Sequence, residues 1–139
     1  MTLNEAIRKG CRMREPIHGE WIAEDGRCCA VGSILVGGGV TQGPITKTHV
    51  EEFLTEEFPE MMRPHSIRCQ KTAPCHFGMT FYGTSPDGSF HMRAPLYCVM
   101  SHLFELHNWS REALAEWADP HPELHIPMPR LEETPAVHA

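Results

Sequence analysis

The sequence predicts a small α+β domain that is mainly helical and carries one short β-hairpin. Three observations predict this class. Apolar residues recur at helical spacing in several segments, a strong turn sequence separates two β-prone segments, and 139 residues suit one domain with a real core. The apolar fraction of 41% and the charged fraction of 22% are typical of globular proteins. We therefore expect a single globular domain over residues 1–119.

The first helix is predicted from its start signal. Thr2 and Glu5 form a capping box, which satisfies the first amides of a helix. Apolar residues then keep helical spacing, and Pro16 should end the helix. After it, Gly19–Ala23 is predicted as a short strand, and Asp25-Gly26 is a turn signal.

The next segment, Cys28–Val36, fits a buried strand or a short buried helix, and periodicity alone does not decide between them. We favour the helix because the small residues at positions 30, 32 and 33 would allow close packing. Gly37–Gly39 ends the segment in either case. These glycines are not a phosphate-binding loop, because the Gly-Lys-Ser/Thr sequence of such loops does not follow them.

A second capping box at Thr48 and Glu51 predicts a helix whose apolar residues lie at i, i+3, i+4 and i+8. The other face of this helix is acidic and carries Glu51, Glu52, Glu56 and Glu57. Such a run is most often a solvated face. It is also the one candidate surface for a protein partner, because concentrated negative charge attracts a basic groove.

The β-hairpin is predicted around Ser85–Gly88, which has Pro at the second turn position and Gly at the fourth. Residues 79–82 and 89–92 would be its strands. A helix over Leu96–His107 should follow, with Cys98, His102 and Glu105 on the face opposite its apolar stripe. Ser110 caps a last helix over 111–118, and residues 120–139 form a tail with five prolines and no periodicity.

Metal-capable side chains are spaced as if to converge. Cysteine thiolates and histidine imidazoles are the ligands of structural zinc, and a tetrahedral site needs four of them. Cys98 and His102 lie one helical turn apart, and a loop could bring two more thiols over them. The predicted zinc ligands are Cys69, Cys75, Cys98 and His102, with His76 and His107 as substitutes. The alternative is that these residues simply pack, as cysteines commonly do. Because His102 and His107 are five residues apart, they do not have the spacing of a zinc protease.

A nucleophilic cysteine is the alternative site. Cys28 and Cys29 lie at the start of the favoured helix, and a helix N-terminus lowers the pKa of a thiol. A histidine base would be needed, for which His18 and His91 are the candidates. The competing interpretation is that both cysteines pack a small-residue segment against the core.

Charge and composition limit the class of partner and the compartment. The formal net charge of −6 argues against a nucleic-acid binder, which usually carries a basic stripe. No apolar run is long enough to span a bilayer, and the first residues lack the profile of a secretory signal. With six cysteines, the chain is expected to be cytoplasmic with reduced thiols.

Two stretches together resemble motifs of short, functionally uncharacterised proteins of bacteria and their phages. Cys29-Ala30-Val31-Gly32 is similar to a Cys-Ala-Leu-Gly motif. Residues 102–117 are similar to a His-Leu-Asn-Asp-x-His-x-Trp-Thr-Arg-Glu-x-Ile-Ala-x-Trp pattern, with Phe104-Glu105 in place of Asn-Asp. The resemblance implies a helical fold and a bacterial or phage origin, and it implies no activity.

The sequence therefore favours a non-enzymatic interaction or regulatory protein of bacterial or phage origin, and a structural zinc is a third interpretation that is compatible with this function. The alternative is an enzyme that uses Cys28 or Cys29 as its nucleophile.

Overall fold

The computed structural model describes residues 1–40, 45–69, 80–84 and 86–118. Five α-helices, one short 3-10 helix (η1) and three strands lie within these ranges, so the domain is α+β and mainly helical, as predicted. The elements in chain order are α1 (Leu3–Met13), α2 (Ala30–Gly37), α3 (Lys47–Glu57), η1 (Pro59–Met62), β1 (Pro64–Cys69), β2 (Thr80–Thr84), β3 (Phe90–Pro95), α4 (Leu96–Leu106) and α5 (Arg111–Trp117).

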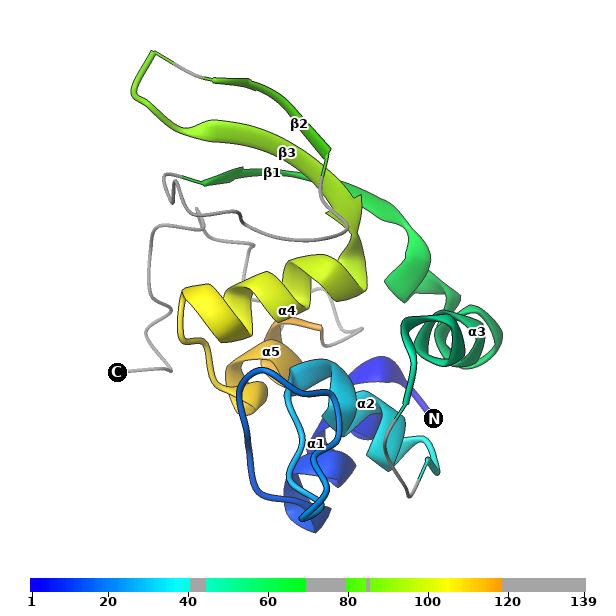
Figure 1. Cartoon of the computed structure of the whole chain (residues 1–139). Coiled ribbons are helices and arrows are strands. Elements are labelled where there is room, and N and C mark those ends of the chain that lie inside the picture. The colour runs from blue at the N-terminus through cyan, green and yellow to red at the C-terminus, as the bar shows by residue number, and fades with distance from the viewer. Residues whose placement is uncertain (41–44, 70–79, 85, 119–139) are drawn as a thin grey trace.

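Helix α4 lies in the middle of the molecule. Figure 1 shows the sheet on one side of α4 and the helices α1, α2 and α5 on the other. The contacts agree, since α4 touches β1 and β3 as well as α2. The buried residues form one core cluster that runs from α1 through α2 and α4 to α5. Side chains of α4 can therefore meet the sheet from one face and the helical layer from another.

The sheet has the strand order β1-β3-β2, and both pairs are antiparallel. The predicted hairpin is confirmed as β2 and β3, although Met79 and Ser85 lie outside the described residues. Strand β1 was not predicted. It begins at Pro64, and a proline is tolerated as the first residue of an edge strand. Its register places Cys69, the last residue of β1, opposite Phe90.

The helix predicted after Cys29 is confirmed as α2, all of whose residues are buried. The close packing expected from its small residues is also present. A Cβ atom on Gly10 of α1 would lie 2.1 Å from the carbonyl oxygen of Ser33, and one on Gly37 would lie 1.9 Å from that of Ala6. Glycine is needed at these positions because the backbones of α1 and α2 touch there.

Two local predictions were wrong. Gly19–Ala23 is not a strand: it belongs to a loop in which Ile22 makes a single antiparallel bridge to Cys28. Helix α3 is capped by Thr46, whose side chain accepts from the His49 amide, so the cap is two residues earlier than Thr48. The capping box at the start of α1 is confirmed, as is the Ser110 cap of α5.

Candidate metal centre

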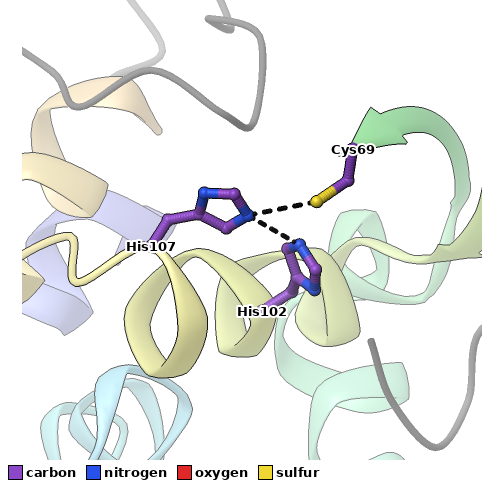
Figure 2. Close-up of side chains that lie close together, drawn as sticks. All are labelled: Cys69, His102 and His107. Atoms are coloured by element: carbon purple, nitrogen blue, oxygen red, sulfur yellow. Dashed lines mark hydrogen bonds between the residues drawn. The ribbon is translucent and has the colours of Figure 1, made fainter. Parts of the chain in front are cut away.

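Three buried side chains of ligand type meet between the sheet and α4. Cys69 comes from the end of β1, His102 from α4, and His107 from the residue that follows α4. One ligand atom from each lies within 4.8 Å of the other two. Figure 2 shows one nitrogen of the His107 ring facing both the Cys69 sulfur and the His102 ring. The exposed fractions are 0%, 1% and 9%, so all three groups are withdrawn from solvent.

The end of α4 explains how two histidines five residues apart can meet. On a continuing helix they would point about 140° apart, because each residue turns the chain by about 100°. Helix α4 instead ends at Leu106, and Asn108 takes a left-handed conformation with φ 58°. Asparagine tolerates this conformation better than most residues. The Trp109 amide then donates to the Leu103 carbonyl over 3.0 Å, which folds the chain back over the last turn.

Strand β1 supplies the third group. Because β1 pairs with β3 and packs on α4, its last residue reaches the helix face that carries His102. The Cys69 sulfur lies 3.3 Å from Nε2 of His107, and the two Nε2 atoms of His102 and His107 are 3.0 Å apart. Nε2 of His107 therefore lies close to both of the other ligand atoms.

These distances suit a tetrahedral metal ion. Zinc bound at about 2.0–2.1 Å to nitrogen and about 2.3 Å to sulfur holds neighbouring nitrogens about 3.3 Å apart and a nitrogen and sulfur about 3.6 Å apart. The separations of His107 from Cys69 and from His102 are each about 0.3 Å shorter than these values. Binding of an ion would therefore require His107 to move slightly away from the other two side chains. The donor set of one thiol and two imidazoles is one that zinc prefers.

A tetrahedral centre needs one more ligand. Cys75 and His76, which the sequence analysis offered as ligands, lie outside the described residues. They remain predictions for the fourth position.

Cys98 is not a member of this group. It lies in the first turn of α4, next to Tyr97 and close to Lys47 and Glu51 of α3. Burial raises the pKa of the Cys98 thiol, and the Tyr97 hydroxyl opposes this effect. The side chain is 5% exposed and packs in the core cluster. His107, named from the sequence only as a substitute, occupies the position that Cys98 was expected to fill.

The thiols of Cys28 and Cys29 do not have the low pKa expected at a helix N-terminus. Cys29 caps α2, and its sulfur accepts from the Gly32 amide over 3.4 Å. Burial nevertheless raises the pKa of Cys29 to about 12, because the cost of desolvating a thiolate exceeds the gain from the cap. Burial also raises the pKa of Cys28, although the Arg111 guanidinium donates to its sulfur over 3.4 Å.

The two histidines considered as bases have other surroundings. Nδ1 of His18 lies 3.1 Å from a Glu105 carboxylate oxygen, and its ring stacks on Phe104 with the centroids 4.3 Å apart. His91 lies in β3 of the sheet. The lowered thiol pKa that the nucleophile hypothesis expects is absent from both cysteines, whose pKa values are raised by burial.

The acidic face of α3 divides into two parts. Glu51 is half-buried and accepts a hydrogen bond of 2.7 Å from the Tyr97 hydroxyl. Glu52, Glu56 and Glu57 are exposed. Glu51 therefore fastens α3 to α4, and the other three carboxylates make the solvent-facing charge.

Comparisons with known proteins gave no match to this chain. No protein-family model, no curated protein and no solved structure matches it. In the part of the chain that the structure describes, no helix combines the length and the apolar character needed to cross a membrane.

Proposed function

We propose that this chain is a small non-enzymatic interaction or regulatory protein whose fold is held by a structural zinc ion. The zinc proposal rests on the buried group of Cys69, His102 and His107. Cys75 is the first candidate for the fourth ligand, on the sequence prediction alone. A bacterial or phage origin is part of the proposal and rests on the resemblance of residues 29–32 and 102–117.

Burial of the ligands supports a structural role over a catalytic one. A catalytic zinc keeps an open position for water and substrate, whereas a structural zinc is closed by protein ligands. The most exposed of the three side chains is His107, at 9%. A metal here would join the end of β1 to the end of α4, which are 38 residues apart in the chain. It would thereby fasten the sheet to the helical layer.

Metal content and a cobalt spectrum test this proposal. Untagged protein should contain one zinc per chain, and Co²⁺ substitution should give a sulfur-to-cobalt charge-transfer band because Cys69 is a ligand. Cys69→Ser should weaken that band, because the variant loses one thiolate ligand. Cys11→Ser, which changes a half-buried thiol outside the group, should keep it. Folded protein that binds neither metal would overturn the zinc proposal.

The exposed carboxylates of α3 support an interaction role with a basic protein surface. Three carboxylates close together on one helix give a local negative field that steers a positively charged partner. Glu51 is excluded from this surface because Tyr97 holds it.

A lysine-rich peptide is the probe for this surface, with binding followed by calorimetry at two salt concentrations. Replacing the three exposed α3 glutamates by glutamine should weaken binding more than a control with the same change of charge elsewhere. The control replaces three other exposed glutamates, Glu15, Glu24 and Glu112. Equal losses in the two triple variants would mean that only net charge matters, and the α3 surface would then be abandoned.

A further inference from the structure

A second candidate site is a cavity of about 440 Å³ beside α4, whose lining residues differ from those of the metal centre. Its walls come from the loop before α2, from the N-cap of α2, from α4, and from the segment that leads into α3. Trp21, Ile22 and Ile45 give it an apolar lining. Small-molecule sites are concave, mostly apolar, and about 300–1,000 Å³ in volume, and this cavity meets all three conditions.

The charged groups that line this cavity are acidic. Glu20 and Glu105 line it, and the described lining residues include no lysine, arginine or histidine. Ser101 adds a hydroxyl one helical turn before Glu105, on the same face of α4. A bound anion would be repelled by both carboxylates, whereas a cation would be attracted by them.

The Glu105 carboxylate is held in a defined position. One oxygen accepts from the Gly19 amide over 3.0 Å, and the other lies 3.1 Å from Nδ1 of His18. Its side chain is 31% exposed, so it is partly shielded from water. A carboxylate oriented in this way does not need to be ordered when a ligand arrives, which favours binding.

We propose that this cavity binds a small organic cation, namely an ammonium group on an aromatic or aliphatic body. The body would fill the apolar lining, and the ammonium would lie against Glu105 and Ser101. The Trp21 ring adds a surface that attracts cations through its quadrupole. This site does not depend on the proposed zinc, because its residues and the three metal-site residues are different.

The first test compares three probes that share one body and differ in charge: 2-phenylethylammonium, 2-phenylethanol and phenylacetate. Each is titrated into the full-length protein, as purified, and followed by ligand-observed NMR. The ammonium should bind with a Kd on the order of 1 mM, as expected for so small a molecule. The alcohol should bind more weakly, and the anion should not bind. Equal binding of all three probes overturns the proposal. The proposal also fails if the ammonium does not bind at a concentration of about ten times this estimated Kd.

The second test is Glu105→Gln, which retains a carbonyl oxygen for the Gly19 amide. The variant should bind the ammonium about fivefold more weakly, the value of a partly exposed ion pair, and should bind the alcohol as before. The matched control is Glu112→Gln, which removes an exposed carboxylate from α5 and should change neither affinity. An unchanged ammonium affinity in Glu105→Gln would assign the binding to another surface. The order of the three probes with the unmodified protein tests the proposal even if this variant fails to fold.

Discussion

Replacing His107 by glutamine removes one imidazole from the proposed zinc centre and leaves a side chain of similar size. In the unmodified protein, zinc at 1,000 times its Kd stabilises the fold by about 4 kcal/mol, because it binds only the folded state. Unfolding 139 residues changes the entropy by about 0.3 kcal/mol per kelvin, so zinc should raise the Tm by about 14 °C.

The variant should lose most of that increment. Loss of a supporting residue around a metal costs up to about 100-fold in affinity, and loss of a ligand should cost at least as much. At the same zinc concentration the stabilisation then falls to about 1.4 kcal/mol, or about 5 °C in Tm. The atoms that His107 shares with Cys69 and His102 in hydrogen bonds would be zinc ligands in the metal-bound protein, so the variant loses these hydrogen bonds from the zinc-free state alone.

Thermal unfolding followed by circular dichroism, with zinc and with a chelator, measures the two increments. His49→Gln is the matched control, because His49 is exposed on α3 and lies outside the group. It should keep the full increment. The reasoning is refuted if His107→Gln keeps the same zinc-dependent rise in Tm as His49→Gln.

Three further predictions concern the fold around the site. Gly32→Ala should destabilise the protein by about 3 kcal/mol in urea unfolding, because the new Cβ would lie 1.7 Å from a backbone oxygen. The control is Gly83→Ala, which has open space around it and should change the stability by less than about 1 kcal/mol. Burial raises the pKa of Cys29 from 9.0 to about 12, so the stability it contributes is complete below pH 9 and is lost as the pH rises towards 12. The unfolding free energy of the unmodified protein should therefore fall about 1.4 kcal/mol per pH unit more steeply there than that of Cys29→Ser, and equal slopes would contradict this. Tyr97→Phe should lower the free energy of unfolding by about 1.5 kcal/mol, because the hydrogen bond to Glu51 is lost. The same change should cost less in a protein that already carries Glu51→Gln, and additive losses would show that the bond is not formed.

Features that depend on a few neighbouring residues could be predicted from the sequence. The capping box at Thr2 and the cap at Ser110 are such features, because a side chain that accepts from an amide three residues later acts locally. The small residues of α2 also predicted its close contact with α1. The α3 cap was misplaced because Thr46 and Thr48 both have the right chemistry and the tertiary structure selects one of them.

Features that depend on contacts between distant residues could be predicted only in part. Cys69 and His102 were both named as ligands, and the structure brings them together. The part taken by His107 depends on the end of α4 and on the left-handed Asn108, which no spacing rule predicts. The raised pKa of Cys29 follows from complete burial, and the cap at the helix N-terminus, which is visible in the sequence, has the opposite and smaller effect.

The metal content of untagged protein, measured by mass spectrometry after purification without chelator, tests the central claim most directly. We predict one zinc per chain, removed by a strong chelator together with a fall in Tm, and retained by His49→Gln but not by Cys69→Ser. Folded protein without zinc, whose Tm does not change when zinc is added, would contradict the claim and return Cys69, His102 and His107 to a hydrogen-bonded cluster in the core.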